Sequence, residues 1–198
     1  MKTHFLGYLI ILIYCISIGK INAQDHSETS HDDKKEKDHV SQPFKKHRIA
    51  FIWGNTIVPA AKTATDESSV LMFPTWGLSY SFSFSKKIGI SWLNELEMQS
   101  YIYEHDGHPE MEREYPFISS ILFVYEPIHR LALFAGPGIE IESSHNFSVF
   151  NIGVEYVFPL PDYFDLAFGV DYQRKNKTYD AWTVGLSIGK RFGKPTSH

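Results

Sequence analysis

Three groups of residues have the types and spacing that chemistry requires, and the most enzyme-like is the run Glu142-Ser143-Ser144-His145. A serine, a histidine and a carboxylate together can carry acyl transfer, so a membrane-embedded lipid hydrolase would use this run. No nucleophile-elbow sequence accompanies it, and SSHN is also the composition of an ordinary turn. We therefore expect a surface loop here and assign no catalytic residue.

Histidines form the second group, as candidate metal ligands. His105 and His108 lie three residues apart in a polar stretch, and two ligands are too few to specify a metal. Four more lie in or next to a mixed-charge segment near the N-terminus, with no spacing that fixes a site: His26, His31, His39 and His47. We expect solvated histidines, no metal and no cofactor.

The third group consists of charged residues at alternate positions of apolar segments. Because successive side chains of a strand leave opposite faces, such residues share one polar face. The set is Arg48, Glu95, Glu97, Arg130, Glu140, Glu155, Asp165, Asp171 and Arg191. Buried charges need partners, so we expect a network of ion pairs that fills the interior of a barrel. The excess of acids favours one alternative, a narrow path for cations or protons.

Eight β-like segments must position these residues. They span 47–59, 75–85, 88–103, 115–126, 129–141, 147–158, 163–174 and 180–192. Their number is even, and their lengths are close to the ~9–11 residues of a tilted membrane strand. Short connections (85–87, 126–129 and 158–162) alternate with longer or more polar ones (60–69, 104–114, 142–146 and 175–180). This alternation is typical of an outer-membrane barrel whose two termini are periplasmic.

The stretch PTWGLSYSFSFS (74–85) shows how the two faces of a strand differ. Bulky apolar residues alternate there with Gly and Ser, and 163–174 and 180–192 also alternate; 47–59 and 115–126 alternate poorly. Small residues suit the cramped interior of an eight-stranded barrel, which leaves the apolar face for lipid. The residues assigned to lipid are Trp76, Leu78, Tyr80, Phe82, Phe84, Trp182, Leu186 and Phe192.

The fold class is therefore all-β, an eight-stranded antiparallel up-and-down transmembrane β-barrel. The alternative is a secreted, soluble, lipocalin-like barrel with the aromatic side chains turned inward.

The two ends of the chain have other compositions. Residues 1–23 combine Lys2 with an apolar run and a small residue before the expected cleavage point, which indicates a signal peptide. Residues 24–46 are polar with mixed charge and predict a disordered leader. The barrel then spans 47–192, and 193–198 form a short tail. The single cysteine, Cys15, lies in the signal segment, so we expect a mature protein without disulfides or thiolate sites.

Several short motifs carry a resemblance to known proteins: PTWGLSY (74–80), GPGIE (136–140), GVEY (153–156) and GKRF (189–192). With its expected architecture, the chain resembles the small eight-stranded outer-membrane barrels of the OmpA/OmpX type, and more specifically uncharacterised Gram-negative barrels. The resemblance implies no catalytic residues, and it implies the barrel-assembly machinery as a partner during biogenesis. That machinery reads a terminal aromatic residue. Phe192 has the matching phase, and GKPTSH follows it.

We expect a non-enzymatic protein of the cell outer membrane of a Gram-negative bacterium, in contact with membrane lipid and with both termini periplasmic. Its role is structural or loop-presenting, and its lumen is largely filled by Gly, Ser and paired charges. The alternatives are a narrow pore or transporter for small cations or protons, and the lipid hydrolase. The formal net charge is −4 with no basic excess, so we expect no nucleic-acid partner. The oligomeric state does not follow from the sequence.

Overall fold

The computed structural model describes residues 44–59, 61–62, 70–103, 111–143, 145–176 and 178–194. The expected signal peptide, most of the leader and the end of the tail lie outside these ranges. The elements are β1 (His47–Pro59), β2 (Ala61–Lys62), β3 (Val70–Ser83), β4 (Ile88–Glu97), β5 (Tyr101–Tyr103), β6 (Met111–Arg113), β7 (Phe117–Ile128), β8 (Leu131–Ile141), β9 (Phe147–Pro159), the 3-10 helix η1 (Pro161–Tyr163), β10 (Phe164–Lys175) and β11 (Tyr179–Phe192).

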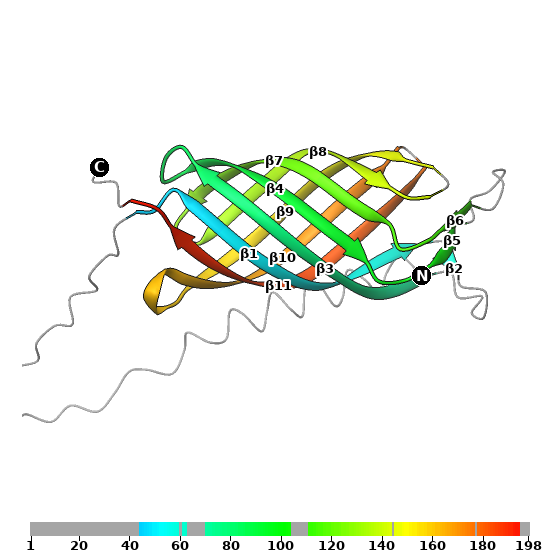
Figure 1. The fold of residues 1–198 in the computed structure, drawn as a ribbon, viewed down its shortest axis with the longest axis horizontal. Helices are drawn as coiled ribbons and strands as arrows, with labels where there is room; N and C mark the ends of the chain where they lie inside the picture. Colours follow the sequence, from blue (N-terminus) through cyan, green and yellow to red (C-terminus); the bar gives the residue numbers. More distant parts are fainter. Residues whose placement is uncertain are drawn as a thin grey trace, which may run out of the picture. The chain divides into compact units, whose positions relative to one another are not determined.

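Eight of these strands form a closed barrel in the order β1-β11-β10-β9-β8-β7-β4-β3 (Figure 1). Every neighbouring pair is antiparallel, and β1 closes the sheet by pairing with both β3 and β11. The predicted fold class is confirmed. Closure leaves no edge strand in the barrel wall, which is the condition that a sheet must meet to cross a bilayer. Among the described residues, no helix is long and apolar enough to span a membrane.

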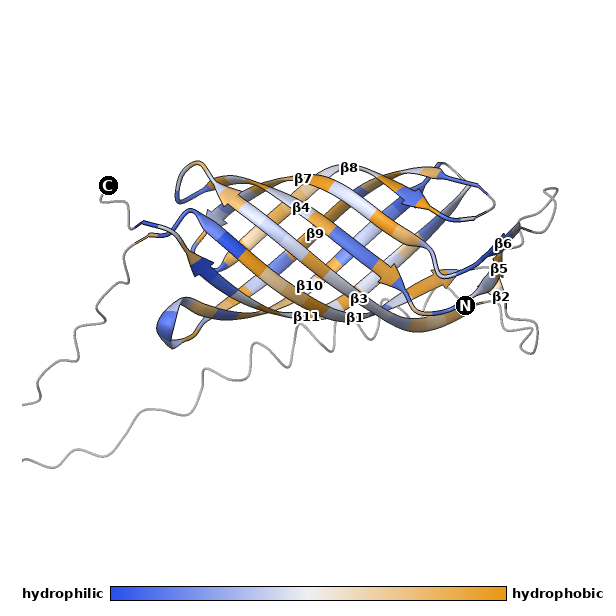
Figure 2. Ribbon diagram, in the orientation of Figure 1, coloured by the Kyte–Doolittle hydropathy of each residue, from blue (hydrophilic) through white to orange (hydrophobic). Residues whose placement is uncertain are grey.

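The two faces of the wall differ in the way that the alternation in 74–85 predicts. Along β3 the outward residues are exposed and the inward ones buried: Trp76 is 49% exposed, whereas Thr75 and Ser79 are 2% and 6% exposed. Figure 2 shows the corresponding alternation of apolar and polar residues along the strands. The soluble alternative required the aromatic side chains of 74–85 inside the barrel, and they are outside. An apolar surface around a whole barrel far exceeds what a soluble monomer exposes, so this is a transmembrane barrel.

At one end of the barrel short connections join neighbouring strands, and we call this the short-turn end. It contains residues 84–87, the pair His129 and Arg130, and the segment 160–163 that includes η1. His47 pairs with Phe192 there, so both ends of the barrel sequence leave from this end. The opposite end is called the loop end, and it carries a second, three-stranded sheet of order β2-β5-β6 (Figure 1).

The differences from the predicted segments lie mostly at the loop end. The expected strand 88–103 is two strands: β4 pairs with β3 and β7 in the barrel wall, residues 98–100 form no strand, and β5 pairs with β2 and β6 in the second sheet. β3 begins at Val70, five residues before the predicted start, since Pro74 is accommodated within the strand opposite Asn55. β2 and β6 are two and three residues long, too short to show a period.

Candidate functional site

The barrel interior consists of two parts that follow one another along the strands. Along β10 the inward residues run from Asp165 near the short-turn end, through Ala167, Gly169 and Asp171, to Gln173 and Lys175 near the loop end. From Asp171 toward the short-turn end the lumen contains a cavity, and from Gln173 toward the loop end side chains fill it. We call the hollow part the vestibule and the filled part the plug.

The plug contains a charge cluster that is sealed from solvent. Lys175 Nζ lies 2.5 Å from Glu97 Oε1 and 2.7 Å from Glu140 Oε2. Arg113 forms an ion pair with Glu140 and a second one, of 3.2 Å, with Glu142. The side chains of Lys175, Arg113 and Glu140 are 0% exposed and that of Glu97 is 1% exposed. Because each charge has an opposite charge in contact, the cluster fills the lumen without leaving a bare ion in a dry interior.

Aromatic residues close the plug on the loop side. Tyr101 donates its hydroxyl to Glu97 Oε2 at 2.8 Å, and Tyr179 donates to Glu140 at 3.0 Å. Tyr101 also stacks on Phe73 with ring centroids 5.1 Å apart, and the Arg113 guanidinium lies 4.5 Å from the ring of Phe147. These rings belong to one buried apolar cluster: Val58, Ala61, Leu71, Phe73, Tyr101, Tyr103, Phe147, Tyr179 and Ala181. An ionic layer and, on its loop side, an apolar layer therefore follow one another along the lumen.

The layer between plug and vestibule holds two acids, Glu95 and Asp171, that no basic side chain of the described residues contacts. Gln173 Nε2 donates to Glu95 Oε2 at 2.7 Å and to Asp171 Oδ2 at 3.0 Å, so one amide joins both carboxylates. The remaining oxygens Asp171 Oδ1 and Gln173 Oε1 are buried and have no hydrogen-bond partner. On the other wall, Thr56 bonds to Thr75 and Thr183.

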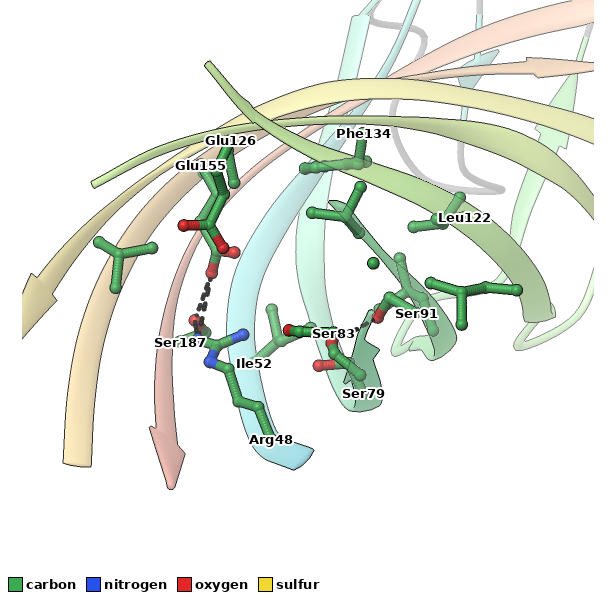
Figure 3. Close-up of a pocket in the computed structure, with 18 of the residues that line it drawn as sticks. Arg48, Ile52, Ser79, Ser83, Ser91, Leu122, Glu126, Phe134, Glu155 and Ser187 are labelled. Atoms are coloured by element: carbon green, nitrogen blue, oxygen red, sulfur yellow. Dashed lines mark hydrogen bonds and ion pairs between the residues drawn. The ribbon is translucent and has the colours of Figure 1, made fainter. Parts of the chain in front are cut away.

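The vestibule is a cavity of about 120 Å³ that extends from Glu95 and Asp171 to the short-turn residues Ser85 and Lys87. Its middle is apolar, with Ile52, Leu93, Leu122, Val124, Ala132, Phe134 and Val157 in the wall. Figure 3 shows Arg48, Glu155 and Ser187 gathered on one side of it, with Leu122 and Phe134 on another.

A second charge cluster lies at the mouth of the vestibule. Arg48 Nη2 is 2.7 Å from Asp165 Oδ1 and 3.5 Å from Glu155 Oε1, and Ser187 Oγ donates to Glu155 at 2.8 Å. Arg191 lies 3.7 Å from Asp165 and 3.8 Å from Glu126. The Glu126, Glu155 and Arg191 side chains are about a quarter exposed, so the cavity is open at this end.

The structure divides the charged residues singled out in the sequence among these layers. Four lie at the mouth (Arg48, Glu155, Asp165 and Arg191), two in the middle layer (Glu95 and Asp171) and two in the plug (Glu97 and Glu140). Arg130 does not join them, and its assignment to the lumen is wrong. β7 continues to Ile128 and β8 starts at Leu131, so Arg130 lies in the turn, exposed and with φ of 75°.

Sequence reasoning missed the two cations at the centre of the plug. Lys175 was assigned to a loop, although it continues the period of two through Asp171 and Gln173 and that period alone could have found it. Arg113 lies in the three-residue strand β6, where no pattern is readable.

The lipid-facing residues named from the sequence lie on the outer wall. Trp76, Leu78, Tyr80, Phe84, Trp182, Leu186 and Phe192 are each between 40% and 57% exposed, and Phe82 is partly exposed beside Phe84. One series of hydrogen bonds between polar groups interrupts this apolar surface. Trp92 Nε1 donates to Ser119 Oγ and Ser119 Oγ to Asn94 Oδ1, each at 2.9 Å, so Asn94 has a partner on an apolar face.

In the structure, residues of the hydrolase-like run Glu142-Ser143-Ser144-His145 contact Arg113 of the plug. Glu142 Oε2 contacts Arg113, and the Arg113 guanidinium also donates to the carbonyl of His145 at 2.8 Å. Ser143 Oγ donates to Glu142 Oε1 at 2.6 Å. Ser144, His105 and His108 lie outside the described residues. Within the described ranges, no three His, Cys, Asp or Glu side chains are grouped so as to hold a metal ion.

No protein-family model and no curated protein matches the chain. It is similar to several solved structures, three of which are described here. One is the attachment invasion locus protein Ail of Yersinia pestis, at 13% identity, over 75% of this chain and 100% of that one, with a TM-score of 0.43. Another is neisserial surface protein A, at 8% identity, over 72% and 97%, with a TM-score of 0.42. The third is the monoaromatic hydrocarbon channel CymD, at 13% identity, over 75% of this chain and 48% of that one, with a TM-score of 0.32.

Proposed function

We propose that the chain is a non-enzymatic, non-conducting barrel of the bacterial outer membrane that holds its loop end at the cell surface. The observation that carries this proposal is the plug. Lys175, Arg113 and Glu140 are 0% exposed, and Tyr101 and Tyr179 cover them on the loop side. An ion that crosses the barrel would have to break these contacts, each of which compensates a buried charge.

The proposed orientation of the barrel in the membrane rests on the difference between its two ends. Both ends of the barrel sequence leave from the short-turn end, and the sheet β2-β5-β6 extends at the loop end (Figure 1). In outer-membrane barrels the short turns are periplasmic and the longer loops extracellular. We infer periplasmic termini and a rigid, plugged base for the external segments.

A narrow cation or proton path is the second candidate, because one observation favours it. Glu95 and Asp171 lie in the middle of the lumen, and no basic side chain of the described residues is in contact with either. The vestibule would supply half of such a path. The other half would require the plug to open.

Conductance across planar lipid bilayers tests the choice between the two candidates. We expect the full chain to give no events above the lipid baseline. The variant Phe134→Ala enlarges only the vestibule and should also be silent. The double variant Tyr101→Ala with Tyr179→Ala removes the cover of the plug and should conduct, which shows that insertion succeeded. Discrete current steps from the unmodified chain would contradict the proposal.

A further inference from the structure

We propose that the vestibule is a binding site for a small amphiphilic cation, a primary alkylammonium ion whose ammonium group contacts Glu95 and Asp171 and whose short apolar chain contacts the cavity wall. This inference goes beyond the proposed function and is independent of whether the plug conducts. It rests on the unpartnered oxygens of the middle layer, the apolar wall and the opening at the short-turn end.

Among the described residues, the two acids of the middle layer share one side-chain donor, the Gln173 amide, and no basic side chain contacts them. Asp171 is 7% exposed and lines the cavity, yet its Oδ1 has no partner. Gln173 is 1% exposed, and its Oε1 is likewise without a partner, because its amide nitrogen is shared between the two carboxylates. Buried acceptors without donors are costly, and two adjacent acids without a counter-ion more so.

The nearby basic side chains already form ion pairs with other acids. Lys175 contacts Glu97 and Glu140 in the plug, and Arg48 contacts Asp165 and Glu155 at the mouth. No described basic residue is therefore in contact with Glu95 or Asp171. An ammonium group would supply the three N–H donors and the positive charge that this layer needs.

The wall of the cavity selects an organic cation over a metal ion. Leu93, Leu122 and Phe134 lie between the acids and the mouth and offer no ligand to a metal. Calcium takes about 6–8 oxygen ligands, and magnesium keeps a shell of water, which this wall would not replace. An alkyl chain gains from the same wall. At about 120 Å³ the cavity is comparable to an engineered cavity of about 150 Å³ that binds benzene, so a chain of a few carbons fits.

The mouth admits a cation from the short-turn side. Glu126, Glu155 and Asp165 face Arg48 and Arg191, and Lys87 also lines the cavity, so the acidic and basic side chains around the opening are balanced. The Glu126, Glu155 and Arg191 side chains are about a quarter exposed, so this is the open end of the cavity. The ligand would enter from the side on which the termini leave the barrel.

Titration of the full chain in lipid nanodiscs with n-butylammonium, followed by calorimetry, tests this site. We expect saturable binding of butylammonium. The affinity for 1-butanol, which has the same chain without the charge, should be lower by about tenfold or more. The double variant Glu95→Gln with Asp171→Asn keeps the shape and removes the charge, and it should lower the affinity for butylammonium by about tenfold or more. Asp180→Asn, an acid outside the cavity, is the matched control and should leave the affinity unchanged.

A second variant separates loss of binding from loss of folding. Ala132→Leu adds volume to the vestibule wall and leaves both acids in place, and it should also abolish saturable binding, with circular dichroism checking that both variants are folded. Equal binding of butylammonium and 1-butanol, unchanged binding by the folded double variant, or no saturable binding at all would overturn the proposal. Saturable binding of calcium chloride that excludes butylammonium would overturn it in favour of a metal site.

Discussion

Lys175 is the residue on which the charge balance of the plug depends. Its ammonium group bridges Glu97 and Glu140 and lies 5.2 Å from the ring of Tyr179, with no exposed surface. Arg113 still pairs with Glu140 if Lys175 is removed, whereas Glu97 keeps only the hydroxyl of Tyr101. A hydroxyl donates a hydrogen bond but does not neutralise a carboxylate. The effect of losing Lys175 therefore acts mainly through Glu97.

Replacing Lys175 with methionine should lower the free energy of unfolding by about 3–5 kcal/mol, because it leaves a buried carboxylate without a counter-charge. Urea unfolding of the refolded barrel in detergent measures this. The double variant Lys175→Met with Glu97→Gln should recover most of the loss. Lys86→Met, at an exposed turn residue, is the control and should stay within about 0.5 kcal/mol. An equally stable Lys175→Met barrel would mean that the plug does not depend on ion pairs.

The inward position of most charged residues could be predicted from alternation alone, because a strand has only two faces. Their partners could not. Arg48 meets Asp165 across β11, and Lys175 meets Glu97 from the opposite wall, contacts that depend on the closure and register of the barrel. The unpartnered oxygens of Asp171 and Gln173 are equally invisible to a pattern of residue types.

At the scale of the elements, the long strands of the barrel wall were predicted more closely than the short strands at the loop end. The bounds of β1 were predicted as observed, and β10 and β11 differ from prediction by one residue at most at each end. β7 was hard to read because Ile118 and Leu122 are apolar and face inward, so both of its faces carry hydrophobic residues. The sheet β2-β5-β6 is made of strands of two or three residues, whose pairing depends on tertiary contacts.

Strands β8 and β9 place a large inward side chain opposite a glycine. Phe134 faces inward opposite Gly153, and its ring occupies the space in which a Cβ at Gly153 would lie. A glycine thus makes room for an aromatic side chain inside a narrow lumen, and the ring then lines the vestibule. The sequence places Phe134 in the phase of Ala132 and Gly136, the inward face of its strand.

The outer face of β3 provides a test at the scale of one element. Leu78 lies midway along the exposed apolar row between Met72 and Phe84 and is 51% exposed. Leu78→Arg should destabilise the barrel in a bilayer by about 2–4 kcal/mol, the cost of a charge near the midplane on the lipid face. Unfolding titrations in lipid vesicles measure this. In the same assay, Leu78→Ala should cost much less, and an unchanged stability of the arginine variant would place this face in water.

At the scale of the whole molecule, the tryptophans report which solvent surrounds the barrel. The chain has four, and all of them lie on the outer wall: Trp53 is 61% exposed, Trp76 49%, Trp92 51% and Trp182 43%. Trp53 and Trp76 are cross-strand neighbours. Because none lies in the lumen, the fluorescence of the chain reports on the exterior of the barrel alone.

Quenching of this fluorescence therefore tests the central claim directly, that the apolar outer wall is immersed in lipid. The full chain is reconstituted in vesicles whose acyl chains carry bromine and compared with vesicles of unbrominated lipid and with added aqueous iodide. We predict strong quenching by the brominated chains and weak quenching by iodide. Strong quenching by iodide with none by brominated lipid would contradict the account and leave the barrel in water.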